Sequence, residues 1–215
     1  MTPRFRSVVL DADSTLSGVE GIDWLAGQRG PEVARAVELA TRRAMEGVVP
    51  LDAVYAERLA LIRPTRDEIA RLGAVYVRAM APDTIRSVER MTQSGVRIVI
   101  VSGGLRDALL PMATVLGIPA TDVHAVRVTY DASDAVESLD GVQPLATAAG
   151  KPLVVRGLRL EPPTLAVGDG MTDAAIRPVV AAFAAYTAYA RRETVIAQAD
   201  HCIDSFTALV RLVLP

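Results

Sequence analysis

Three short apolar runs, each of strand length, stop at a polar or acidic residue. The runs are Ser7–Leu10, 97–101 and 164–167, and the polar residues just beyond them are Asp11, Ser102 and Asp169. Helical patterns separate the runs, which indicates an α/β protein with a mostly parallel sheet. Because the carboxyl ends of parallel strands meet at one edge, we expect the three polar residues to converge on a ligand crevice. Weaker strand patterns occupy 121–128 and 179–183.

The segment after the first strand has a different pattern, because its apolar residues recur at helical spacing. This spacing predicts helices over Pro31–Met45 and 50–62. Thr65 and Glu68 form a capping-box pattern that opens a third helix running through Tyr76. The segment therefore predicts an all-helical insertion.

The division of the chain follows from this change of pattern. We expect a catalytic core of residues 1–16 and 82–215, with a helical cap of residues 17–81 over the crevice. The stretch 131–141 lies between apolar residues and predicts a small β-hairpin flap.

Composition limits the classes of partner. The chain has 215 residues, enough for a sizeable core, and a net charge of -2, which argues against a nucleic-acid binder with a basic field. Its one cysteine, Cys202, favours a reducing compartment. The longest uncharged apolar run, 179–190, is shorter than the roughly 20 residues that span a bilayer. We expect a cytoplasmic protein, monomeric or homodimeric, that binds a small molecule and neither nucleic acid nor membrane.

The sequence Asp11-Ala12-Asp13-Ser14-Thr15 directly follows the first strand. Two carboxylates at this spacing, where the chain leaves the sheet, both reach the crevice. One can act as a nucleophile and the other as a general acid and base, and their oxygens suit Mg²⁺. Ordinary turn or cap chemistry is the alternative interpretation.

Two further polar segments follow strands. Ser102-Gly103-Gly104 combines a hydroxyl with consecutive glycine N–H groups and predicts an anion site where a helix opens at Leu105; a simple turn is the alternative. The segment 168–173, Gly-Asp-Gly-Met-Thr-Asp, offers a metal carboxylate and an outer acidic partner, or merely a glycine turn with a capping aspartate. All basic residues but Lys151 are arginines, so this lysine stands out. The arginine pairs 42–43 and 191–192 are expected to be solvated; a position near an anionic substrate is the alternative.

In this order, the four segments resemble the haloacid dehalogenase superfamily of Mg²⁺-dependent phosphohydrolases. Within it, the chain is similar to the phosphoserine phosphatase family over most of its length. The segment 20–26 resembles the continuation of that family's first motif, and 43–47 and 57–62 resemble its cap helices. The resemblance implies a three-layer, Rossmann-like α/β core with a helical-bundle cap, and hydrolysis of L-phosphoserine through an aspartyl-phosphate.

The resemblance also implies a role for each matching residue. The catalytic residues would be the nucleophile Asp11 and the general acid and base Asp13. The residues that hold the phosphoryl oxygens would be Ser102, Gly103, Lys151 and Thr172. The residues that hold Mg²⁺ would be Asp11, Asp13 through its main-chain carbonyl, and Asp169, with Asp173 in support. The residues that recognise the substrate would be Glu20 for the amino group, Arg58 for the carboxylate and Met45 as pocket lining.

Departures from the family pattern leave alternatives open. Thr172 stands where many relatives carry asparagine, and the alanine-rich segment after Phe183 lacks expected glycines. A relative that acts on another phosphomonoester, or a phosphotransferase that uses another alcohol as acceptor, is one alternative. A receiver-type signalling module is another, although the helical insertion and the second acidic motif argue against it.

Overall fold

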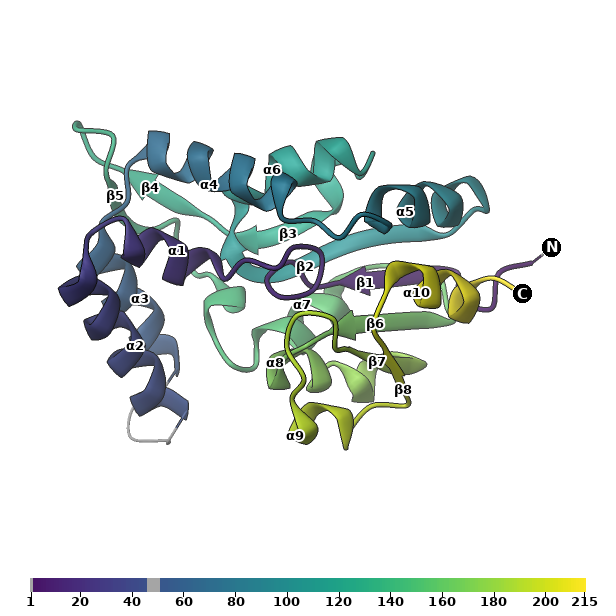
Figure 1. Ribbon diagram of the computed structural model, residues 1–215. Coiled ribbons are helices and arrows are strands. Elements are labelled where there is room, and N and C mark those ends of the chain that lie inside the picture. The colour runs from purple at the N-terminus through teal and green to yellow at the C-terminus, as the bar shows by residue number, and fades with distance from the viewer. Residues whose placement is uncertain (1, 46–50) are drawn as a thin grey trace.

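A six-stranded sheet forms the centre of the molecule, with the strand order β3-β2-β1-β6-β7-β8 and parallel pairing throughout (Figure 1). The computed structural model describes residues 2–45 and 51–215. The strands of the sheet are β1 (Ser7–Leu10), β2 (Arg97–Leu105), β3 (Val123–Val126), β6 (Thr164–Gly168), β7 (Ala182–Tyr186) and β8 (His201–Ile203). The expected α/β class with a mostly parallel sheet is confirmed.

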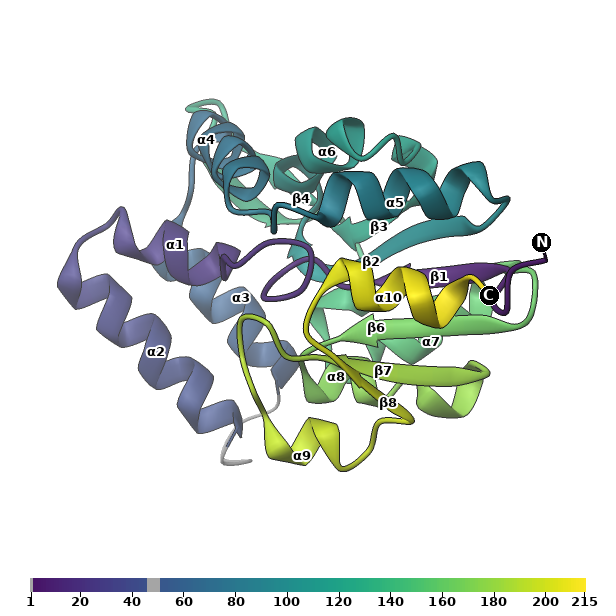
Figure 2. The ribbon, with the colours of Figure 1, turned by 45° about the vertical axis from the view of Figure 1, so that its right-hand side comes forward.

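Helices cover both faces of this sheet, which gives three layers. Helices α5 (Thr84–Gln93) and α10 (Phe206–Val213) lie side by side over one face, and α7 (Gly150–Gly157) lies behind the other (Figure 2). The remaining core helices are α6 (Arg106–Val115), α8 (Met171–Ala174), α9 (Glu193–Ile196) and the 3₁₀ turns Ala120–Asp122, Pro144–Ala146 and Arg177–Val179. Covering both faces explains the nearly continuous apolar runs of the central strands.

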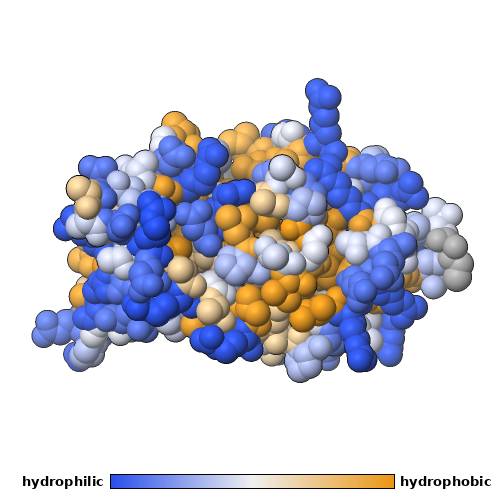
Figure 3. Space-filling model, turned by 90° about the horizontal axis from the view of Figure 1, so that it is seen from above, coloured by the Kyte–Doolittle hydropathy of each residue, from blue (hydrophilic) through white to orange (hydrophobic). Residues whose placement is uncertain are grey.

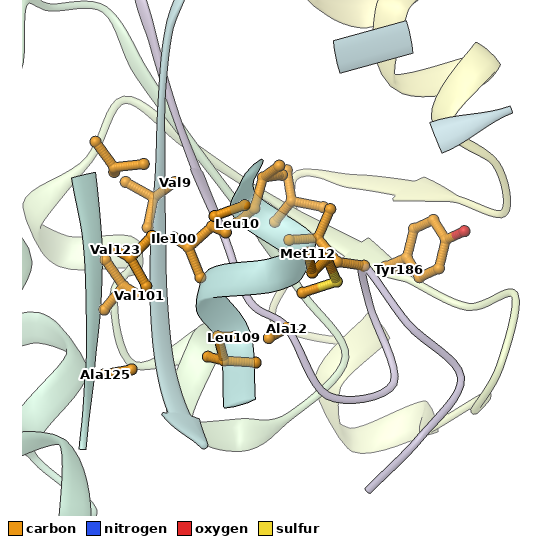
Figure 4. Close-up of a cluster of buried hydrophobic side chains, with 14 of the residues drawn as sticks. Val9, Leu10, Ala12, Ile100, Val101, Leu109, Met112, Val123, Ala125 and Tyr186 are labelled. Carbon is orange, nitrogen blue, oxygen red and sulfur yellow. The ribbon is translucent and has the colours of Figure 1, made fainter. Parts of the chain in front are cut away.

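The core of the fold lies between the sheet and α6. Figure 4 shows Val9 and Leu10 of β1, and Ile100 of β2, with Leu109 and Met112 of α6, all at most 1% exposed. Close packing of this kind fixes the positions of the strand ends. Seen from the side of α4 and α6, hydrophilic residues cover both ends of the molecule and apolar residues appear between them (Figure 3).

Strand order and register set the position of the crevice. Leu10 at the end of β1 is level with Ile100 of β2 and Val167 of β6. The next polar residues, Asp11 and Asp169 among them, therefore leave the sheet at one level. The crevice expected at the carboxyl edge lies where β1 runs between two strands that come from distant parts of the chain.

An all-helical insertion separates β1 from α5. Its helices are α1 (Gly21–Gly27), α2 (Pro31–Met45), α3 (Leu51–Ile62) and α4 (Arg66–Arg78). The predicted capping box is present, since Thr65 Oγ1 accepts from the Glu68 N–H and the Glu68 carboxylate accepts from the Thr65 N–H. Helix α4 packs closely on α6, because a Cβ on Gly73 would lie 2.9 Å from Pro111 Cγ. The core and cap boundaries remain a prediction.

The expected hairpin is present as the antiparallel pair β4 (Val128–Tyr130) and β5 (Val136–Leu139), but its first strand precedes the predicted stretch 131–141. Strand β7 begins at Ala182, later than the run 179–183 suggests, and the 3₁₀ turn Arg177–Val179 includes the first residue of that run. The Ser102-Gly103-Gly104 segment continues β2, so α6 begins at Arg106 and the expected helix start at Leu105 is one residue early. No helix within residues 2–45 and 51–215 is long and apolar enough to cross a membrane.

Candidate active site

Lys151 joins two carboxylates from different strand ends. Its Nζ lies 2.8 Å from Asp11 Oδ1 and 2.7 Å from Asp173 Oδ1. All three residues are at most 7% exposed, so the pairs are shielded from bulk water. Burial alone would lower the pKa of Lys151, but the two carboxylates outweigh it and hold that pKa well above its ordinary value. Lys151 is therefore a fixed positive charge against the predicted nucleophile.

Two glycines make this arrangement possible. A Cβ on Gly150 would lie 1.7 Å from the Pro144 carbonyl oxygen, so only glycine lets α7 start this close and present Lys151. A Cβ on Gly168 would lie 2.1 Å from Asp173 Cγ, so only glycine at the end of β6 leaves room for that side chain. The glycine pattern of the sequence thus serves close approach at both positions.

Three buried carboxylates form a group that fits a divalent cation. Asp11, Asp169 and Asp173 each offer an oxygen, and these oxygens lie within 4.8 Å of one another. A donor set made only of carboxylate oxygens suits a hard cation such as Mg²⁺ or Ca²⁺. The three carboxylates outnumber the two cationic side chains that contact them, Lys151 and Arg192, so excess negative charge remains that a divalent cation would offset.

The Asp13 carboxylate is not part of this group. Its Oδ1 accepts hydrogen bonds from the Gly21 N–H at 2.9 Å and from the Tyr76 hydroxyl at 2.5 Å. Burial, followed by the negative charges of Glu20 and Asp11, raises the pKa of Asp13 to about 7. A carboxyl group with such a pKa both gives and takes a proton near neutral pH, as a general acid and base must.

The glycine-rich end of β2 lies beside these residues. Ser102 is fully buried, and its Oγ accepts a hydrogen bond from the Gly104 N–H at 3.0 Å. The Tyr55 hydroxyl of α3 donates to the Gly103 carbonyl at 2.7 Å, which links the insertion to this segment. Thr172 lies half-buried in the first turn of α8.

The side chains proposed for substrate recognition lie on the inserted helices. Glu20 is the N-cap of α1, and its Oε1 accepts from Ser14 Oγ at 2.6 Å. Arg58 on α3 donates from Nη1 to Thr41 Oγ1 at 3.3 Å. Met45 ends α2, and its side chain is outside the described part of the structure, as are Glu46 and Gly47.

Arg58 has an N–H group that is available to a ligand. Its guanidinium carbon lies 5.5 Å from the centre of the Tyr55 ring, whose hydroxyl reaches Gly103. Its Nε is buried without a hydrogen-bond partner among the described residues. Since an unpaired buried N–H is costly, this atom is a natural partner for an acceptor group of a ligand.

Two residues of the site were not identified from the sequence. Arg192, expected to be solvated, contacts the Asp169 carboxylate through Nη1, donates to its carbonyl at 3.1 Å, and lies 3.8 Å from Glu20 Oε1. For Tyr76, the sequence predicts only a place on a helix. A tyrosine on an apolar helix face and an arginine in a loop give no local signal, because both reach the site through tertiary packing.

Known proteins resemble the whole chain. The model of the haloacid dehalogenase-like hydrolase family matches residues 8–177. Phosphoserine phosphatase of Homo sapiens is 36% identical over 207 residues, which cover 95% of this chain and 91% of the human protein. The chloroplastic phosphoserine phosphatase of Arabidopsis thaliana is 31% identical, covering 95% of this chain and 70% of its own. The solved structure of a phosphoserine phosphohydrolase-like protein from Francisella tularensis subsp. tularensis SCHU S4 has a TM-score of 0.85 at 25% identity, covering 96% of this chain and 99% of that one.

Proposed function

The chain belongs to the haloacid dehalogenase-like hydrolases and is a phosphatase, and on that basis we propose that it hydrolyses L-phosphoserine with the help of Mg²⁺. The observation that carries the proposal is the position of Lys151 between Asp11 and Asp173 at the carboxyl edge of the sheet. We further propose that residues 1–16 and 82–215 form the catalytic core and residues 17–81 the cap. A cytoplasmic location stays a prediction from the single cysteine.

The first half of the reaction transfers the phosphoryl group to the enzyme. A carboxylate oxygen of Asp11 forms a bond to phosphorus, and the bond from phosphorus to the serine oxygen breaks. Asp13 gives its proton to that oxygen, so serine leaves as a neutral alcohol. The enzyme then carries an aspartyl-phosphate on Asp11.

The second half returns the enzyme to its starting state. Asp13, now a carboxylate, takes a proton from a water molecule whose oxygen attacks phosphorus. The bond between phosphorus and the Asp11 oxygen breaks, and inorganic phosphate leaves. The pKa of Asp13 near 7 suits both of its tasks.

Phosphoryl transfer depends mainly on positioning and on neutralising oxygen charge. In this proposal Ser102, the Gly103 N–H, Lys151 and Thr172 hold the phosphoryl oxygens. Asp11, the Asp13 main-chain carbonyl and Asp169 would hold Mg²⁺, with Asp173 in support, and the buried carboxylate group fits this ion. When bound, the ion would offset negative charge on the phosphoryl oxygens.

Recognition of the amino acid part would rest on the insertion. Glu20 pairs with the substrate ammonium and Arg58 with its carboxylate, while Met45 lines the pocket. The unpartnered Nε of Arg58 supports this role, because a carboxylate accepts two parallel N–H bonds from a guanidinium. Binding at both charged groups distinguishes phosphoserine from esters that carry only one of them.

A phosphate-release assay tests the proposal. The enzyme is assayed with Mg²⁺ on L-phosphoserine, on phosphoethanolamine, which lacks the carboxylate, on 3-phosphoglycerate, which lacks the amine, and on p-nitrophenyl phosphate. We expect phosphoserine to have the highest kcat/KM and a chelator to abolish release until Mg²⁺ is restored. A higher kcat/KM for another ester would make that ester the substrate in place of phosphoserine. A phosphorylated product formed from an added alcohol would show that the enzyme is a phosphotransferase.

A further inference from the structure

The two oxygens of the Asp13 carboxyl group have different surroundings. Oδ1 accepts two hydrogen bonds, from the Gly21 N–H at 2.9 Å and the Tyr76 hydroxyl at 2.5 Å. Oδ2 accepts no hydrogen bond from any residue within 2–45 and 51–215. A Cβ placed on Gly104 would lie 3.2 Å from Oδ2 and 3.4 Å from Ser102 Oγ, so Oδ2 lies against the segment proposed to hold phosphate.

Tyr76 reaches Asp13 only because the surrounding residues leave room for its hydroxyl. The side chain is fully buried on α4. A Cβ on Gly21 would lie 2.0 Å from the Tyr76 hydroxyl oxygen, so glycine at this position is needed for the contact. The same glycine supplies the second donor to Oδ1 through its N–H. The start of α1 and the middle of α4 together hold one oxygen of Asp13.

Resting on the proposed function, we propose that Tyr76 is a positioning residue that occupies Oδ1 of Asp13 and thereby leaves Oδ2 as the atom that transfers the proton. An oxygen that already accepts two donors has little capacity for a third hydrogen. The acid proton therefore sits on Oδ2, beside the phosphate-binding segment. Tyr76 keeps its own proton throughout.

The proton balance follows from this assignment. In the first half-reaction the O–H bond on Oδ2 breaks and its proton goes to the serine oxygen as the phosphorus–oxygen bond breaks. In the second half-reaction a proton from water returns to Oδ2. The hydrogen bonds on Oδ1 persist in both halves, so the carboxyl group does not rotate between them.

A leaving-group comparison tests this role. Serine leaves as an alkoxide unless it is protonated, whereas p-nitrophenolate is stable without a proton. Removing the hydroxyl in Tyr76→Phe should therefore slow phosphoenzyme formation from phosphoserine far more than from p-nitrophenyl phosphate. The pre-steady-state burst of the released alcohol reports this step alone, so later hydrolysis of the intermediate does not mask it.

The burst rates are measured on the Mg²⁺-loaded full chain. For Tyr76→Phe we expect the serine burst to slow by about 10- to 100-fold, part of the ~10²- to 10⁴-fold that general acid catalysis supplies. The p-nitrophenolate burst should slow by less than about 3-fold, because its leaving group needs no acid. Equal slowing of both bursts would reduce Tyr76 to a structural residue, and no slowing of the serine burst would overturn the proposal.

Tyr130→Phe provides a matched control. It also removes a tyrosine-to-aspartate hydrogen bond, from Tyr130 to Asp107 Oδ2 at 3.1 Å, but on the hairpin and α6. Both bursts should keep their wild-type rates in this variant. If the wild-type enzyme leaves phosphoserine intact, the proposed substrate fails by itself, and an alkyl phosphate that the enzyme does hydrolyse takes its place in the same comparison.

Discussion

The strand ends and the inserted helices build the site in different ways. At the carboxyl edge of the sheet, Asp11 after β1, Lys151 at the start of α7 and Asp173 on α8 are buried and paired within 2.8 Å. On the insertion, the side chain of Glu20 is 49% exposed, and among the described residues Arg58 has a hydrogen bond only to Thr41. The groups that perform the chemistry are preorganised, and the groups that recognise the substrate retain free hydrogen-bonding capacity.

This difference follows from how each half is positioned. Strand register and the close approach at Gly150 and Gly168 fix the backbone behind the chemical groups, so their geometry does not depend on long side chains. Recognition depends on long side chains that the inserted helices carry. Substitutions of the chemical groups should therefore lower activity on every substrate. Substitutions of the recognition side chains should lower activity only on substrates that carry the amino or carboxylate group.

The largest effect is expected at the nucleophile. Asp11→Asn removes the attacking carboxylate and should lower kcat by about 10⁴-fold or more on every ester, while the fold is retained. Phosphate release measures the loss, and circular dichroism with a thermal scan checks the fold. Substantial remaining turnover in a folded variant would refute the assignment of Asp11 as the nucleophile. It would also refute the claim that the buried groups at the carboxyl edge of the sheet perform the chemistry.

Lys151→Met should destabilise the fold as well as inactivate the enzyme. Without the ammonium, Asp11 and Asp173 face each other as buried carboxylates, and the unfolding free energy should fall by about 3 kcal/mol. Mg²⁺ should restore part of the loss, because the cation takes over the charge balance. Denaturant unfolding with and without Mg²⁺ measures both effects; a variant as stable as the wild type would show that the pairing contributes nothing.

Arg58→Ala probes the recognition half. It should lower kcat/KM for phosphoserine by about 10- to 100-fold, the cost of about 1.5–3 kcal/mol for a lost charge-assisted bond. Turnover of phosphoethanolamine, which has no carboxylate, should change little. Arg66→Ala removes a similar contact, an arginine 3.8 Å from the Tyr130 ring centre, and serves as the matched control. Equal losses on both esters would exclude the carboxylate role.

The smallest expected effect concerns an ion pair within the insertion, between Arg29 and Glu68. Hydrogen bonds from Arg29, followed by the Thr65 N–H, lower the pKa of Glu68 from 4.5 to about 2 against the opposing effect of burial. This stabilisation is present above pH 4.5 and is lost as pH falls through 4.5 towards 2. Denaturant unfolding should show a steeper loss for the wild type than for Glu68→Gln over this range. Identical pH dependence would mean that the pair does not stabilise the fold.

The strand-end half could largely be predicted from the sequence. Asp11 follows an apolar run directly, Asp173 lies in the polar segment after another, and parallel pairing brings such segments together. Lys151 does not follow a strand and was singled out because it is the one lysine of the sequence. The Thr65 capping box was equally local and is confirmed. The contacts of Tyr76 and Arg192 could not be predicted, because they depend on where α4 and a distant loop pack, which no local pattern encodes.

The most direct test of the account is to locate the phosphoryl group on the protein. The Mg²⁺-loaded enzyme is mixed with L-phosphoserine, quenched in acid within the first turnover, and its peptides are analysed by mass spectrometry. The account predicts a phosphorylated peptide with the modification on Asp11, and none in Asp11→Asn. A phosphoryl group on Ser102, or turnover without any phosphorylated peptide, would contradict it.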